Sequence, residues 1–115
     1  MSNSERDLAV IVSLQVEGIH KWDGCNIEGM DFLKHLHRHI FFITAKKSVI
    51  GTDREVEIIM LKRCIIDFLR TKYHINGCLM FGNMSCEDIA VELLHEFHLE
   101  SCKVLEDNEN GAEAY

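Results

Sequence analysis

The chain has 115 residues, of which 47% are hydrophobic and 27% are charged, and its formal net charge is -7. This length fits one domain spanning residues 1–115, and the scattered Lys and Arg argue against nucleic acid, which needs concentrated positive charge. Apolar runs stay shorter than the roughly 18 residues of a membrane span, and the N-terminus lacks the apolar stretch of a secretion signal, so we expect a cytoplasmic protein without a membrane partner.

The first half of the chain predicts two strands separated by a long loop. Apolar and polar residues alternate from Leu8 to His20, which is the pattern of a half-buried strand. Residues 21–34 contain two glycines and are typical of a loop, with one helical turn expected from Met30 to Lys34. The β-branched and aromatic residues from about His35 to Lys46 indicate a second strand.

Two amphipathic helices are predicted next. Apolar side chains from Ile58 to Leu69 recur at helical spacing, with charged residues between them. The segment 71–84 breaks this pattern, and Ser85 then supplies a capping residue for a second helix from Cys86 to about Phe97.

The end of the chain predicts little more than one hairpin. Residues 101–107 have the composition of a short strand, and residues 109–115 indicate a turn into a last strand that barely starts. The expected order is therefore ββααββ, an α+β fold in which two helices cover one face of an antiparallel sheet.

Three histidines spaced two residues apart open the second predicted strand. Alternate residues of a strand share one face, so His37 and His39 project the same way, about 7 Å apart. With His20 at the end of the neighbouring strand, they would offer three neutral imidazoles and leave an open fourth position, as catalytic zinc sites do. His35 has the same parity and could replace one of the three.

Five short segments form a pattern that spans nearly the whole chain. A histidine followed by a basic residue ends the first strand, and a His-x-His unit opens the second. A Glu-Val-Glu-Ile run with a later Leu-Lys precedes and opens the first helix, an Asn-x-Ser-x-Glu-x-x-Ala run opens the second, and a Val-x-Glu unit lies near the end, followed by a tyrosine. These segments are Gly18–Trp22, His37–Phe41, Glu55–Lys62, Asn83–Ala90, and Cys102–Asp107 with Tyr115.

In this order the segments resemble the 6-pyruvoyltetrahydropterin synthase and 6-carboxytetrahydropterin synthase family, whose subunits have the tunnelling fold (T-fold). The resemblance implies Zn²⁺ bound by His20, His37 and His39, and a pterin or purine-nucleotide-derived substrate. It also implies that Glu106 holds the aminopyrimidine edge of the substrate ring, since a carboxylate can accept two parallel N–H donors. Ser85 and Cys86, at the start of the second helix, would add contacts to the substrate.

The family's proton-transfer residues are not matched at their usual places. The general base is usually a cysteine a few residues before the His-x-His unit, whereas Cys25 lies twelve residues before His37. Asp31 or Glu28 could serve as a carboxylate base instead. The family's Asp-His pair has only His74 as a counterpart, preceded by a tyrosine. Cys25, Asp31 and His74 are therefore the candidate catalytic residues.

We expect a zinc-dependent synthase-like protein with lyase chemistry. The alternative is a noncatalytic protein of the same fold that binds a pterin or purine nucleotide for sequestration or regulation. Because such sheets have open edges, we also predict a cyclic homo-oligomer, a trimer or hexamer, in which the sheets join into a barrel with sites at the subunit seams.

Overall fold

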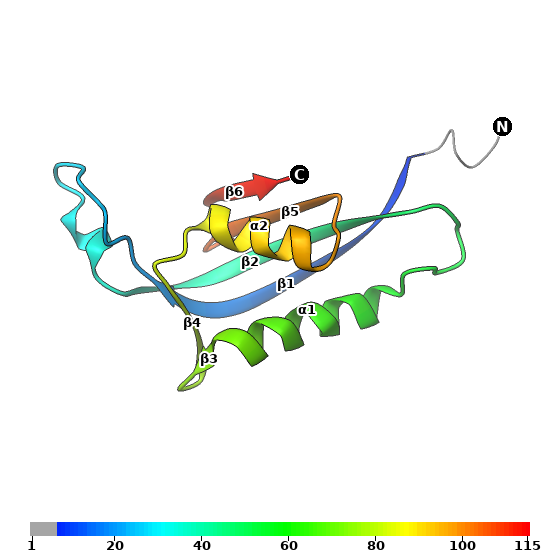
Figure 1. Ribbon diagram of the computed structural model, residues 1–115, viewed down its shortest axis with the longest axis horizontal. Helices are drawn as coiled ribbons and strands as arrows, with labels where there is room; N and C mark the ends of the chain where they lie inside the picture. The colour runs from blue at the N-terminus through cyan, green and yellow to red at the C-terminus, as the bar shows by residue number, and fades with distance from the viewer. Residues whose placement is uncertain (1–6) are drawn as a thin grey trace.

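Two 13-residue strands run through the centre of the fold (Figure 1). The computed structural model describes residues 7–115. In it β1 (Leu8–His20) pairs antiparallel with β2 (His37–Val49), in a register that joins Leu8 to Val49 and His20 to His37. The loop between them projects beyond the end of the sheet and contains a 3₁₀ turn at Asp31–Lys34, which confirms the loop and its helical turn (Figure 1).

Both predicted helices are present, and side chains cap their first turns. The Glu57 carboxylate accepts hydrogen bonds from two backbone N–H groups at the start of α1 (Ile58–Tyr73). Ser85 and Asp88 form a reciprocal capping box at the start of α2 (Cys86–Glu96), which confirms the predicted cap. Neither helix, nor any other among residues 7–115, combines the length and apolarity needed to cross a membrane.

The segment between the helices corrects the predicted order. It forms a hairpin of β3 (His74–Ile75) and β4 (Cys78–Gly82), so ββααββ lacks two strands. β4 pairs in parallel with the end of β1, where Gly18 lies beside Leu79, so the sheet is mixed and not antiparallel. The Asn76-Gly77 turn has positive φ at both residues, the usual geometry of a two-residue hairpin. That dipeptide was the local signal for the hairpin. The parallel pairing of β4 with β1 has no such local signal, because it depends on tertiary contacts.

The C-terminal hairpin is also more complete than expected. β5 (Ser101–Glu106) pairs antiparallel with β2, and β6 (Asn110–Ala114) pairs with β5 along its five residues. The six strands lie in the order β3-β4-β1-β2-β5-β6.

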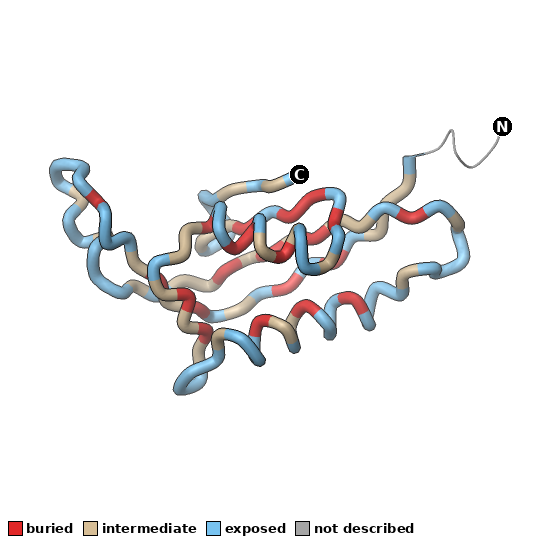
Figure 2. Tube along the Cα trace, viewed as in Figure 1, coloured by how far each residue is buried: buried red, intermediate tan, exposed pale blue. Residues whose placement is uncertain are grey.

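Both helices pack on the same face of this sheet, as predicted, and one hydrophobic core lies between the two layers (Figure 2). The alternation of side chains along β1, β2 and β5 sends one set of apolar residues into this layer. The residues of the core that are least exposed to solvent are Phe41, Ile43, Ile65, Leu69, Ile89, Leu93, Cys102 and Val104. The fold is thus α+β. The inner face of its sheet, which the helices cover, continues toward the loop between β1 and β2.

Candidate metal centre

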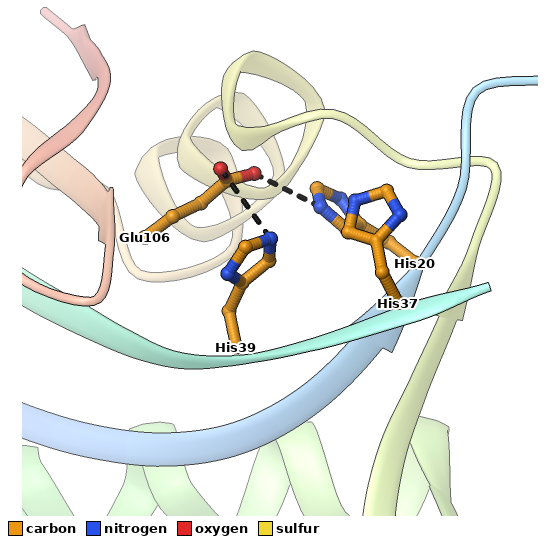
Figure 3. A group of neighbouring side chains, drawn as sticks. All are labelled: His20, His37, His39 and Glu106. Carbon is orange, nitrogen blue, oxygen red and sulfur yellow. Dashed lines mark ion pairs between the residues drawn. The ribbon is translucent and has the colours of Figure 1, made fainter. Parts of the chain in front are cut away.

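Four potential metal ligands gather on the inner face of the sheet. His20 ends β1, His37 and His39 open β2, and Glu106 ends β5 (Figure 3). The ladders place His20 opposite His37 and Glu106 opposite Phe41, two residues beyond His39 along β2. These four side chains therefore share one face because they share the parity of the core residues in their strands.

The ligand atoms of the cluster lie within 4.8 Å of one another. Nε2 of His20 is 2.9 Å from one oxygen of Glu106, and Nε2 of His39 is 3.5 Å from the other. The ring centroids of His20 and His37 are 4.5 Å apart, and those of His37 and His39 are 5.1 Å apart. Among the described residues, no other set of three or more His, Cys, Asp or Glu side chains is close enough together to hold a metal ion.

Each histidine of the cluster uses its other ring nitrogen, Nδ1, to donate a hydrogen bond. The acceptors are the carbonyl of Met84 for His20 and the carbonyl of His35 for His37, each at 2.9 Å. For His39 the acceptor is a carboxylate oxygen of Asp107, at 2.7 Å. Because these partners can only accept, Nδ1 carries the proton in each ring, and a neutral ring then presents the bare Nε2 that a metal requires.

One buried atom of the cluster lacks a hydrogen bond. Nε2 of His20 has no hydrogen-bond partner among residues 7–115, although a Glu106 oxygen lies 2.9 Å away. Burial lowers the pKa of His20 from its ordinary value of 6.5, against the opposing effects of the Met84 hydrogen bond and the Glu106 charge. The neutral ring would then turn a lone pair toward a carboxylate. A cation bound by both atoms removes this conflict, so the residues fit a divalent metal.

The chemistry of the donors narrows the choice of metal. Three imidazole nitrogens and one carboxylate oxygen form a set that Zn²⁺ accepts, while Mg²⁺ and Ca²⁺ prefer sites built of oxygen. The cluster could thus hold a transition metal ion.

A cavity of about 510 Å³ adjoins the cluster, and His20, His37 and Glu106 form part of its wall. The candidate substrate-binding residues Ser85 and Cys86 line the same cavity, so the structure brings them together with Glu106. The Cys86 sulfur lies 3.8 Å from a Glu106 oxygen, and burial raises the pKa of this thiol to about 12. Cys86 is therefore protonated at neutral pH and can donate a hydrogen bond to Glu106.

The three candidate catalytic residues lie elsewhere. Cys25 is buried within the loop between β1 and β2, where its thiol donates to the carbonyl of Met30 at 3.4 Å. Asp31 is exposed on the 3₁₀ turn of that loop, and His74 is exposed at the end of α1. None of the three lines the cavity or belongs to the cluster.

Two other histidine and carboxylate candidates also stay outside the cluster. The ring of His35 does not join it, and this residue contributes only its carbonyl, which accepts the hydrogen bond from His37. Glu28 is exposed in the loop between β1 and β2.

Asp107 and the Met84 carbonyl are partners of the cluster that no motif of the sequence indicated. The only signal for Asp107 was its place directly after Glu106, at the end of a predicted strand. Hydrogen bonds from His39 and from the backbone N–H of Ile40 lower the pKa of Asp107, so it is ionised at neutral pH. No local signal pointed to Met84, because a backbone carbonyl is common to every residue.

A scan of the sequence against models of known protein families finds no match. A search of curated proteins likewise finds no match to this chain. What the site can do chemically is therefore inferred below from its geometry and from the short motifs of the sequence.

Proposed function

We propose that this chain is a zinc-dependent T-fold protein similar to the 6-pyruvoyltetrahydropterin and 6-carboxytetrahydropterin synthases, with lyase chemistry on a pterin or purine-nucleotide-derived substrate. The observation that carries the proposal is the convergence of three bare Nε2 atoms and one carboxylate beside a cavity. The motifs shared with that family in the same order along the chain support it as well.

The proposed roles begin with the metal. His20, His37 and His39 would hold Zn²⁺, and Glu106 is near enough to complete the set. When bound, zinc would supply a Lewis acid that polarises a hydroxyl or carbonyl oxygen of the substrate. The hydrogen bonds at Nδ1 would keep the three rings in the tautomer that binds a metal, since a proton on Nε2 would block ligation.

In this proposal Glu106 also anchors the substrate ring. A carboxylate accepts two parallel N–H donors, as the 2-amino group and ring N–H of a pterin or guanine present them. The cavity volume of about 510 Å³ lies within the usual range for small-molecule sites. Substrate would then compete with the metal for the Glu106 oxygens, and the Cys86 thiol would help to orient the carboxylate.

One observation favours the noncatalytic alternative. Cys25, Asp31 and His74 are outside the cavity, and Cys86 keeps its proton at neutral pH. A protein that binds a pterin or purine nucleotide without turnover needs the metal and the anchor but no general base. In the proposed oligomer a neighbouring subunit could supply the base at a seam, so catalysis stays the first proposal.

Turnover and binding are separated by one set of measurements. Zinc-loaded protein is incubated with dihydroneopterin triphosphate, and release of triphosphate is followed together with ligand retention. We expect release with wild-type protein and none with His37→Ala, which removes a ligand. Retention of the intact substrate without release, at high protein concentration, would establish the binding alternative. If the protein neither retains the substrate nor releases triphosphate, the proposed function is overturned.

His95→Ala is the matched control for this experiment. It removes an exposed histidine of α2 that lies outside the cluster, at a position where alanine suits the helix. Its zinc content and its triphosphate release should equal those of the wild type.

A further inference from the structure

We propose that Asp107 is a positioning residue of the metal centre, which holds the His39 ring in the tautomer that leaves Nε2 free and thereby strengthens metal binding. This inference rests on the metal centre of the proposed function. It assigns to a residue of the turn between β5 and β6 a role that the resemblance to pterin synthases does not imply, because the family motif has threonine there.

Three hydrogen bonds attach Asp107 to the strand that carries His39. One carboxylate oxygen accepts from Nδ1 of His39 at 2.7 Å, and the other accepts from the backbone N–H of Ile40 at 3.0 Å. The backbone N–H of Asp107 donates to the carbonyl of Ile40 at 2.8 Å. Both carboxylate oxygens are thus committed, and the side chain cannot turn without breaking a bond to β2.

The support given to His39 differs in kind from that given to the other two ligands. His20 and His37 donate to neutral backbone carbonyls. Among residues 7–115, Asp107 is the one side chain that accepts a hydrogen bond from Nδ1 of a histidine in the cluster. An ionised acceptor raises the basicity of the opposite ring nitrogen, so a carboxylate strengthens His39 as a ligand more than a carbonyl would.

The backbone of this turn allows a clean substitution. Asp107 has φ of 54° and Asn108 has φ of 61°, both in the left-handed region. Asparagine tolerates this region as well as aspartate does, so Asp107→Asn keeps the backbone preference and the side-chain shape. It leaves one acceptor oxygen in place of two, and it adds an N–H₂ group beside the two donors of β2.

Asparagine is therefore expected to reverse the tautomer of His39. Its oxygen can accept from the Ile40 N–H while its amide donates to Nδ1, which moves the ring proton to Nε2. The ring would then have to change tautomer before it could bind a metal. Loss of an outer carboxylate of this kind typically weakens metal affinity about 10- to 100-fold.

Two measurements on the full chain test the proposal. The dissociation constant for Zn²⁺ is obtained by competition with a chromophoric chelator, and the tautomer of His39 is obtained in zinc-free protein from its ring ¹⁵N chemical shifts. We expect Asp107→Asn to bind zinc about 10- to 100-fold more weakly and to carry the His39 proton on Nε2. Wild-type protein should carry that proton on Nδ1.

Asp53→Asn is the matched control. It makes the same change of charge at an exposed aspartate whose partner in the structure is Arg54, outside the cluster. Its zinc affinity and its His39 tautomer should equal those of the wild type.

The outcomes separate this inference from the proposed function. Wild-type protein that fails to bind zinc would overturn both. Tight binding by wild type with equal affinity in Asp107→Asn would overturn the positioning role alone. Weaker binding with the His39 proton still on Nδ1 would also overturn it, because the effect would then come from the fold of the turn and not from the tautomer.

Discussion

At the scale of single residues, the surroundings of Glu106 allow two roles for its carboxylate. The resemblance implies a ring anchor, whereas the structure places its oxygens 2.9 Å and 3.5 Å from two histidine nitrogens. The register of β5 against β2 explains this, since Glu106 opposite Phe41 has the parity of the inner face. The same carboxylate is therefore available to a metal and to a ligand in the cavity.

A charge-neutral variant distinguishes the two roles. Glu106→Gln keeps the shape of the side chain but replaces a good zinc ligand with a poor one, so we expect zinc affinity to fall at least about tenfold. Chelator competition measures this, with Glu87→Gln, another residue of the cavity wall, as control. Unchanged zinc affinity together with lost retention of a pterin would assign Glu106 to the ring alone.

The buried imidazole of His20 should make the stability of the zinc-free protein depend on pH. Its folded pKa is lowered from 6.5, chiefly by burial, so between these two values the unfolded chain binds more protons than the folded one. The free energy of unfolding therefore has its highest value, as far as His20 is concerned, above about pH 6.5. It falls as the pH drops from 6.5 toward the folded pKa of His20.

Urea unfolding in the presence of a chelator, at a series of pH values from 7.5 downward, measures this loss. The loss should be smaller in His20→Asn, whose amide can still donate to the Met84 carbonyl but does not titrate. If the free energy of unfolding falls equally with pH in the two proteins, His20 is not the source of the loss.

At the scale of elements, the end of β1 joins the core to the metal centre. The Phe41 and Phe81 rings pack edge to face with centroids 5.2 Å apart, and both lie against Gly18. The Phe41 ring also contacts His20 and His39, at centroid distances of 5.2 Å and 5.9 Å. The position of two ligand rings thus depends on how the strands pack around Gly18.

A single methyl group at Gly18 tests that dependence. A Cβ there would lie 2.6 Å from a Phe81 ring carbon and 2.9 Å from Phe41, so Gly18→Ala should destabilise the protein by about 1–3 kcal/mol. We also expect weaker zinc binding, because displacing Phe41 moves its histidine neighbours.

Denaturant unfolding compares this variant with Gly51→Ala, whose Cβ would meet only a Glu55 oxygen at 3.5 Å. Equal unfolding midpoints for the two variants would contradict this prediction, because Phe41 and Phe81 would then move aside for the methyl group without loss of stability.

At the scale of the whole molecule, the subunit is elongated. Its radius of gyration is 16.1 Å and its extents are 56 × 30 × 20 Å, whereas a compact domain of about 100 residues has a radius near 13 Å. β4 pairs only with the last residues of β1, so the earlier part of β1 has no paired strand on that side within residues 7–115. Exposed apolar residues occur in β1, in the turn after β2 and at the start of α1, and they are Ile11, Ile50, Ile58, Ile59 and Met60.

The assembly into a trimer or hexamer stays a prediction, and the open edge of β1 offers a place to test it. Light scattering should give three or six times the mass of one chain. Ile11→Lys, which places a charge on the unpaired stretch of β1, should shift the protein toward smaller species, since lysine on an edge opposes strand pairing. Val91→Lys, at an exposed apolar site of α2, should leave the mass unchanged. A monomeric wild type would contradict the assembly.

Much of the site was predictable because its signals are local. The alternation that ends at His20 and the spacing of His37 and His39 set the faces of two adjacent strands, and the structure places all three rings on one face. Ser85 is a cap in the structure as predicted, since a capping box needs only a few neighbouring residues. The position of Cys25 was not predictable in the same way, because the path of a long loop depends on what it packs against. His74 lies where α1 ends and the β3–β4 hairpin begins, and the place of that hairpin beside β1 depends on tertiary contacts.

The sequence by itself determined the alternating strands, the amphipathic helices and the three histidines of the cluster, because periodicity and capping act over a few residues. Only the tertiary structure decided that Glu106 joins the cluster, that Asp107, 68 residues beyond His39, accepts a hydrogen bond from its ring, and that β4 runs parallel to β1. These features depend on the register between strands distant in the chain, and a shift of one residue would turn each side chain to the opposite face.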